Sequence, residues 1–144
     1  MIATAQLTAD LREDEGEKLT AYQDSLGYWT IGVGILIDGR KGGGITKEES
    51  AMLLANRIAT KTVEASQRIQ GFAQLDEVRQ GAVLNMCFQM GVDGVLAFNN
   101  SLALIRNKQW EAAAAALKQS KWFTQTPARA GRVIEQIRTG KYRT

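Results

Sequence analysis

The sequence predicts a mixed α+β fold that is mostly helical, with a small lobe holding a β-hairpin or sheet and a larger helical lobe joined by a long helix. Three observations predict it. Residues 28–37 alternate with a period of two, residues 46–70 contain neither glycine nor proline, and the rest of the chain divides into capped apolar segments. We expect a single domain over residues 1–144, with the small lobe at about 12–58, the linking helix at about 46–70 and the helical lobe at about 71–144.

The opening segment is predicted to be an amphipathic helix. Leu7, Leu11 and Glu15 follow one another at intervals of four, and Gly16 supplies a stop signal. Glu15 therefore continues an apolar stripe. A glutamate held against apolar surface can keep its proton and act as an acid, whereas a solvated carboxylate at a helix end has no such role. The spacing leaves both interpretations open.

A turn at residues 24–27 precedes the predicted strand. One face of that strand is continuous and apolar, and consists of Trp29, Ile31, Val33, Ile35 and Ile37. The other face is small and includes Thr30, Gly32 and Gly34. Glycines inside a strand either allow close approach of a ligand or backbone, or mark a tightly bent hairpin. The pattern does not decide between these alternatives.

The remaining elements are predicted as helices with recognisable ends. Thr46 and Glu49 fit a capping box at the start of the long helix. A core helix follows over about 75–90 and ends at Gly91. Later helices are expected to start after Ser101, at Trp110, and at Thr126-Pro127, with Gly140 ending the last.

Composition excludes several classes of chemistry. Histidine is absent, which removes imidazole metal sites and nucleophiles that are activated by histidine. The single cysteine, Cys87, has an apolar setting that favours a buried packing thiol, and it permits no internal disulfide. We expect no metal, no cofactor, no signal peptide and no stable membrane insertion, because no stretch approaches the roughly 20 apolar residues of a membrane span. Acid-base chemistry must therefore use carboxylates.

Charge is distributed unevenly along the chain. The net charge is +3, but the segment from Lys118 onward carries seven basic residues against Glu135 alone. Such a basic end suits a polyanionic partner, whether nucleic acid, anionic lipid or an acidic cell wall, and does not choose between them.

Glu15, Asp24 and Thr30 form a candidate catalytic set. A glycosidic bond is cleaved by one carboxylic acid that protonates the leaving oxygen and by a second carboxylate that directs water or attacks the sugar. Thr30 lies on the open strand face, where a hydroxyl can hold that water. Two acids nine positions apart are weak evidence by themselves.

The wider sequence resembles the T-even phage lysozyme family. Asp14-Glu15-Gly16 and the segment 22–34 resemble its catalytic signature, in which Glu, Asp and Thr are separated by eight and five residues. Residues 85–91 and 121–134 resemble the helical lobe of the same family, and the likeness runs from about Leu11 to Lys141.

The resemblance implies a muramidase, or endolysin, that hydrolyses the bond from N-acetylmuramic acid to N-acetylglucosamine in peptidoglycan by single displacement with inversion. Glu15 matches the proton donor, Asp24 the second carboxylate, and Thr30 the hydroxyl that places the water. Substrate contacts carry over to Leu36, Phe88, Ser101, Tyr22, Gln89, Trp122 and Arg129. For Phe88 and Trp122, core packing remains an equal alternative.

The resemblance also implies how the N-terminal helix packs, the oligomeric state and the place of action. The N-terminal helix is expected to pack between the lobes, and the protein to be a monomer made in a host cytoplasm that acts on the wall in the periplasm during lysis. Without an N-terminal export anchor, it would need a holin-type membrane pore for access. Two positions depart from the family pattern: Ile35 stands where a histidine is common, and Ala116 where an asparagine contact is found.

Two other functions remain as alternatives. A lytic transglycosylase needs one acid and forms an anhydro product, so Asp24 and Thr30 argue against it. A nonenzymatic wall or nucleic-acid binder would use the basic end in a salt-dependent manner and would not depend on Glu15. No recognised nucleic-acid motif is present, so we expect no nucleic-acid partner.

Overall fold

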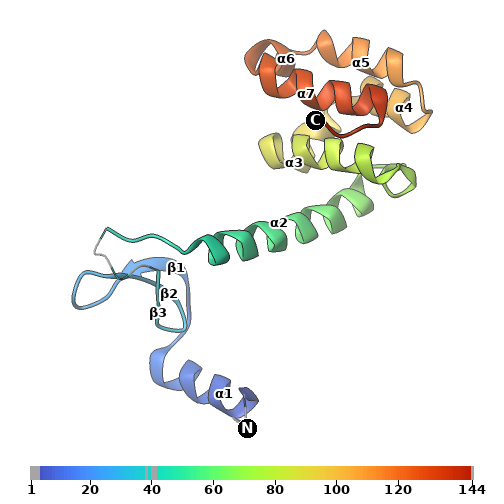
Figure 1. The fold of residues 1–144 in the computed structure, drawn as a ribbon. Coiled ribbons are helices and arrows are strands. Elements are labelled where there is room, and N and C mark those ends of the chain that lie inside the picture. The colour runs from blue at the N-terminus through green and yellow to red at the C-terminus, as the bar shows by residue number, and fades with distance from the viewer. Residues whose placement is uncertain (1–3, 38, 40–41, 144) are drawn as a thin grey trace. The chain divides into compact units, whose positions relative to one another are not determined.

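The computed structural model describes residues 4–37, 39 and 42–143. The chain divides into two units, Met1–Leu54 and Ala55–Thr144, and each is described by itself. Figure 1 labels the elements of both. The mixed α+β class is confirmed, because the described residues form a small antiparallel sheet and a majority of helices.

The N-terminal unit begins with helix α1 (Thr4–Glu15). It ends where predicted, because Gly16 adopts a left-handed conformation (φ 72°) and donates its backbone N–H to the carbonyl of Arg12 (3.0 Å). Leu7, Leu11 and Glu15 are all exposed. The burial that the apolar stripe predicts for Glu15 is therefore not found within this unit.

Three strands follow in the order β1-β2-β3: β1 (Lys18–Gln23), β2 (Trp29–Gly32) and β3 (Ile35–Leu36). Both pairs are antiparallel. The prediction of one continuous strand over 28–37 is wrong, and the bent-hairpin alternative is confirmed. Gly32 (φ 67°) and Gly34 (φ 63°) take positive φ values that reverse the chain, a conformation that side chains other than glycine disfavour.

Helix α2 (Lys47–Arg68) confirms the predicted capping box. The Thr46 N–H donates to Glu49 Oε1 (3.2 Å), and the Glu49 N–H donates to Thr46 Oγ1 (3.1 Å). Downstream of α2, Gly71 (φ 82°) leads into a short 3₁₀ helix, η1 (Phe72–Gln74). Ile69 and Phe72 are buried in the core of the C-terminal unit.

After the last part of α2 and η1, the C-terminal unit continues with α3 (Glu77–Leu96), α4 (Asn99–Arg106), α5 (Trp110–Lys118), α6 (Lys121–Gln125) and α7 (Pro127–Thr139) (Figure 1). Helix α7 packs on α3, α5 and α6, and α4 packs on α5. Buried side chains include Phe72, Val83, Met86, Leu117, Ile134 and Ile137. This core anchors α3, as its dense apolar sequence predicts.

Several helix boundaries match their predicted signals. Asp76 caps α3 by accepting the backbone N–H of Arg79 (3.0 Å), and the helical geometry of α3 breaks at Gly91 (φ 77°). Gly140 (φ 68°) ends α7, which has proline in its first turn.

Two parts of the helical prediction are wrong or incomplete. Helix α4 begins at Asn99, so Ser101 lies inside it and is buried rather than capping it. Helix α6, capped by Ser120 through the Phe123 N–H (3.2 Å), has no counterpart among the predicted elements.

Cys87 is a buried free thiol, as predicted, and burial raises its pKa to about 11. Among the described residues, no single helix combines the length and apolarity needed to cross a membrane; α3 and α4 meet that test only as a pair bent by 105°.

Candidate active site

Asp24 is held by the turn between β1 and β2. Its Oδ1 accepts the backbone N–H groups of Leu26 (2.9 Å) and Tyr28 (2.9 Å). An aspartate that accepts backbone N–H groups further along the chain stabilises a tight turn. Both bonds end on Oδ1, and within the described residues no hydrogen bond reaches Oδ2. The carboxylate is thus fixed in orientation with one oxygen left for other contacts.

Thr30 lies on β2 and is 3% exposed. Its Oγ1 donates to the carbonyl oxygen of Tyr28 (3.2 Å). The same carbonyl accepts the backbone N–H of Asp24 (2.8 Å). The backbone of Tyr28 therefore links the carboxylate of Asp24 to the hydroxyl of Thr30.

Glu15 lies at the end of α1, against the bend of the hairpin. A Cβ built on Gly34 would come within 2.7 Å of Glu15 Oε2 and 3.0 Å of its Cδ. Only a residue without a side chain permits this approach, and Gly34 also has a positive φ. The structure thus places Glu15 at one end of β2 and the linked Asp24 and Thr30 at the other.

The roles of Gly34 and Tyr28 differ in how visible they are in the sequence. For Gly34 a signal existed, because a pair of glycines in a strand indicates close backbone approach as well as a bend. For Tyr28 there was none, since the bond to Thr30 uses a backbone carbonyl that every residue possesses.

Tyr22 and Leu36 flank Thr30 in the sheet. In the antiparallel register, Tyr22 is opposite Thr30 on one side and Leu36 is opposite it on the other. Directly opposed residues point to the same face, so three predicted site residues share one row across the sheet. The ammonium of Lys18 lies 4.5 Å from the centre of the Tyr22 ring.

Gln89 and Trp122 contact one another in the C-terminal unit. The Trp122 Nε1–H donates to Gln89 Oε1 (2.9 Å), and Gln89 Nε2 donates to Thr126 Oγ1 (3.2 Å). Trp122 is 7% exposed and meets the Phe98 ring edge-on, with the ring centres 6.0 Å apart. This geometry favours core packing for Trp122.

The other predicted contacts of this unit differ in exposure. Phe88 is 40% exposed, so it is not a core side chain of the unit. Ser101 is buried. Arg129 donates from Nε to Asn85 Oδ1 (3.0 Å) and from a terminal nitrogen to the Asn85 carbonyl (3.2 Å).

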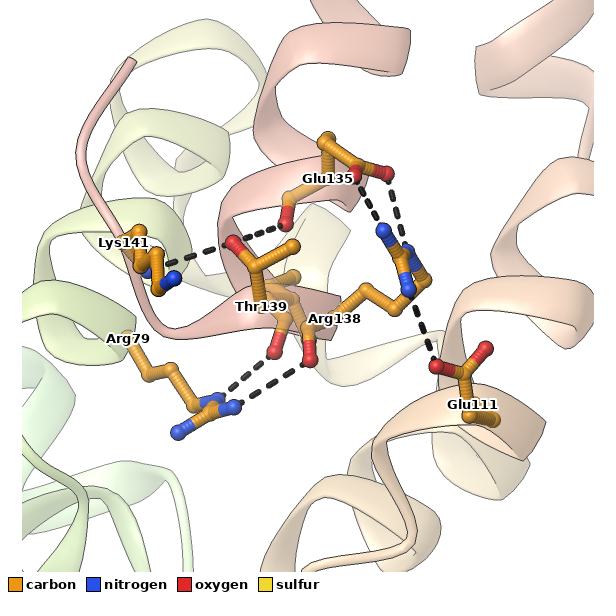
Figure 2. Close-up of polar contacts among 7 residues, drawn as sticks. Arg79, Glu111, Glu135, Arg138, Thr139 and Lys141 are labelled. Atoms are coloured by element: carbon orange, nitrogen blue, oxygen red, sulfur yellow. Dashed lines mark hydrogen bonds and ion pairs between the residues drawn. The ribbon is translucent and has the colours of Figure 1, made fainter. Parts of the chain in front are cut away.

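The basic C-terminal segment is more internally paired than its composition indicates. Arg138 bonds to Glu135 and to Glu111 of α5 (3.0 Å), and Arg79 reaches the carbonyls of Ile137 (2.6 Å) and Arg138 (3.2 Å) (Figure 2). The carboxylate of Glu135, followed by that of Glu111, raises the pKa of Arg138. These two acids offset much of the charge that Arg138 would present to a partner.

The described residues were also compared with the side-chain groupings that hold metal ions. In the part of the chain that the structure describes, no three His, Cys, Asp or Glu side chains are grouped so that they would hold a metal ion.

The family model described as Phage lysozyme matches residues 12–140, which include Glu15, Asp24 and Thr30. The chain belongs to the phage lysozyme family. It is therefore a glycoside hydrolase of the lysozyme type.

The relatives of this phage lysozyme family member differ in the share of their own length that the match covers. Probable T4-type lysozyme 1 of Dictyostelium discoideum is 40% identical, over 90% of this chain and 92% of the relative. The pre-baseplate central spike protein Gp5 of Enterobacteria phage T4 is 36% identical over 90% of this chain and 27% of its own length. Peptidoglycan hydrolase gp36 of Pseudomonas phage phiKMV is 31% identical over 89% of this chain and 14% of its own.

Both departures from the family pattern fall outside the bonds that hold Asp24 and Thr30. Ile35 pairs with Ile31 across the hairpin and is 55% exposed, and Ala116 lies half-buried on α5. Neither residue contributes a hydrogen bond to the candidate catalytic set.

Proposed function

We propose that the chain hydrolyses the β-1,4 bond between N-acetylmuramic acid and N-acetylglucosamine in bacterial peptidoglycan, by acid-assisted attack of water and without a cofactor. The single observation that carries the proposal is the bonding of Asp24 and Thr30 to the backbone of one residue, Tyr28, in a member of the phage lysozyme family. The relative in phage phiKMV is named a peptidoglycan hydrolase, which supports this substrate.

The proposed reaction assigns one role to each side chain. Glu15 donates a proton to the glycosidic oxygen as the bond from that oxygen to C1 breaks. Asp24 and the hydroxyl of Thr30 orient a water molecule whose oxygen forms the new bond to C1, and the water proton passes to the carboxylate. The bonds that fix Asp24 Oδ1 and Thr30 Oγ1 keep both acceptors in place without reorganisation.

Substrate contacts are proposed on both units. Tyr22 and Leu36, beside Thr30 in the sheet, would contact the sugar that receives the water. Phe88 presents an exposed aromatic ring of the kind that packs on sugar faces. Gln89 and Arg129 complete the proposed set, and their bonds support a role in orienting the surface around Phe88. Ser101 and Trp122 are buried, so we propose that they support this surface from within the unit and do not contact the sugar.

Product analysis tests the chemistry. Hydrolysis adds one water to the released disaccharide-peptides, whereas a lytic transglycosylase gives anhydro products that lack this mass. We expect mass spectra of digested peptidoglycan to show hydrated, reducing products. The anomer first formed, followed by NMR, distinguishes the inversion that we propose from retention. Anhydro products would contradict the hydrolytic mechanism.

We further propose that the protein acts in host-cell lysis at phage release, as a monomer made in the cytoplasm that reaches the wall through a holin-type pore. Production in a Gram-negative host tests this setting. Cells making the chain with a holin should lyse, while cells making the chain alone should stay intact until their membranes are permeabilised. Prompt lysis without a holin would contradict the proposed route.

A further inference from the structure

Strand β1 is irregular between Lys18 and Tyr22. Lys18 is opposite Gly32 and Tyr22 is opposite Thr30, so residues four positions apart on β1 face residues two positions apart on β2. The extra length of β1 is taken up as a bulge. Bulges of this kind are frequent next to active sites, where they redirect a side chain.

The bulge brings Lys18 close to the ring of Tyr22. Residues four positions apart in a regular strand are separated by about 13 Å, whereas residues two positions apart are separated by about 7 Å. The ammonium of Lys18 accordingly lies over the Tyr22 ring, 4.5 Å from its centre. This distance is within the range of a cation–π interaction.

Gly32 leaves the side chain of Lys18 unobstructed. Directly opposed residues in an antiparallel pair point to the same face, and Gly32 has no side chain to place there. A Cβ on Gly32 would meet only Ile35 Cδ1, at 3.9 Å. Lys18 therefore extends along the sheet toward the row that contains Tyr22 and Thr30, without a side chain of residue 32 in its way.

The charge of Lys18 is not offset by an acid. Glu17 pairs with Arg12 (3.5 Å), and within the described residues no carboxylate forms an ion pair with Lys18. Tyr22 is half-buried on a strand that lies at the edge of the described sheet. The contact with Lys18 thus restrains a ring that the sheet covers only in part.

We propose that Lys18 is a positioning residue that holds the ring of Tyr22 in the orientation in which it contacts the sugar. The inference rests on the proposed function, which assigns that sugar contact to Tyr22. The face of a tyrosine ring carries partial negative charge, so an ammonium on one face is attracted to the ring and limits its rotation. The other face is left for the sugar. A ring that is already oriented loses less side-chain entropy when the substrate packs on it.

Steady-state kinetics on soluble peptidoglycan strands test this role. Lys18→Met keeps most of the length of the side chain but removes its charge. We expect KM to rise about three- to fivefold and kcat to stay within about twofold, because an oriented ring stabilises bound substrate and transition state alike. Lys18→Arg keeps a cation that stacks on aromatic rings and should retain the parental KM. Lys47→Met, which removes an exposed lysine of the same unit, is the matched control and should also retain it.

A double-mutant cycle tests whether the effect passes through Tyr22. Tyr22→Leu removes the ring, and in this background Lys18→Met should change KM by less than about 1.5-fold. An equal rise of KM in both backgrounds would overturn the proposal, as would a parental KM in Lys18→Met alone. A shifted pH–rate profile of Lys18→Met with unchanged KM would also overturn it, because the ammonium would then act on the acids directly.

A second measurement does not depend on catalysis. A ring shields protons that lie over its face, so the Cε protons of Lys18 should give NMR signals upfield of those of other lysines. In Tyr22→Leu the signals should return to the ordinary position, and an ordinary position in the parent would overturn the contact. Urea unfolding of Lys18→Met should match that of Lys47→Met. Failure of the proposed function is distinguishable, since the parent would then release no sugars while the Lys18 signals stayed shifted.

Discussion

The carboxylate of Glu15 lies against the backbone of Gly34, so closely that a Cβ on Gly34 would come within 2.7 Å of Glu15 Oε2. The hairpin between β2 and β3 therefore has two consequences. It bends the chain after Thr30, and it leaves space for the proposed proton donor at the end of α1.

This contact predicts that Gly34→Ala reduces activity by displacing Glu15. The added methyl group cannot share the space of Oε2, and a misplaced acid costs about 100-fold in rate. Gly32→Ala is the matched control, since Gly32 has a similar φ (67°) but its Cβ would meet nothing nearer than 3.9 Å.

Both alanine variants should lose about 1 kcal/mol of stability from the strained backbone. Only Gly34→Ala should lose most of its muralytic rate. Equal rates for the two variants, measured at equal fractions of folded protein, would show that the Glu15 contact is not used.

A second prediction concerns the hydroxyl of Thr30. Thr30→Val keeps the shape of the buried side chain but removes the group that bonds to Tyr28 and is proposed to orient water. We expect a fall of at least about 100-fold in kcat with a modest loss of stability. Thr30→Ser retains the hydroxyl and should keep much of the activity. An active Thr30→Val protein would remove Thr30 from the mechanism.

Acid stability should depend on Asp76. Partial burial raises the pKa of this carboxyl, but hydrogen bonds from the Arg79 backbone and guanidinium outweigh it and hold the pKa below its ordinary value. A lowered folded-state pKa stabilises the fold above the ordinary carboxyl pKa of about 3.9, and this stabilisation is lost as the pH falls through the folded-state pKa.

Asp76→Asn keeps a side chain that can cap α3 but removes the charge. The parent should therefore melt at a higher temperature than Asp76→Asn at pH 7, and the two melting temperatures should converge near pH 2. A constant difference across this range would contradict the assigned role of the charge.

Arg79 should be hard to replace even by lysine. Its guanidinium stacks over the Trp110 ring (3.8 Å), bonds to Asp76 (3.0 Å) and reaches two carbonyls at the end of α7 (Figure 2). Because an ammonium cannot reproduce these planar contacts, Arg79→Lys should cost about 1–3 kcal/mol in urea unfolding. Arg57→Lys, on the exposed surface of α2, should cost less than about 0.5 kcal/mol.

The sequence predicted those features that depend on local chemistry. The stops at Gly16, Gly91 and Gly140 and the Thr46–Glu49 capping box require only neighbouring residues, and the structure has each of them. Strand β1 escaped prediction because cross-strand pairing is set by residues distant in sequence, whereas the bend at Gly32 and Gly34 was predicted as one of two alternatives.

The candidate site also has parts that the sequence shows and parts that only the fold shows. The identities and order of Glu15, Asp24 and Thr30 were visible in the sequence and gave the family. Their connection through the Tyr28 carbonyl was not visible, because backbone acceptors leave no compositional trace. The burial of Ser101 was missed for another reason: a serine before an apolar run looks like a helix cap even when the helix begins earlier.

The most direct test of the account is the muralytic rate of Glu15→Gln beside that of the parent, on outer-membrane-permeabilised Gram-negative cells, with released sugars analysed and folding checked by circular dichroism. The substitution preserves the size of the side chain but removes the acid. We predict an intact fold with release of sugars reduced to background. An undiminished rate from the folded variant would contradict the central claim that Glu15 donates the proton.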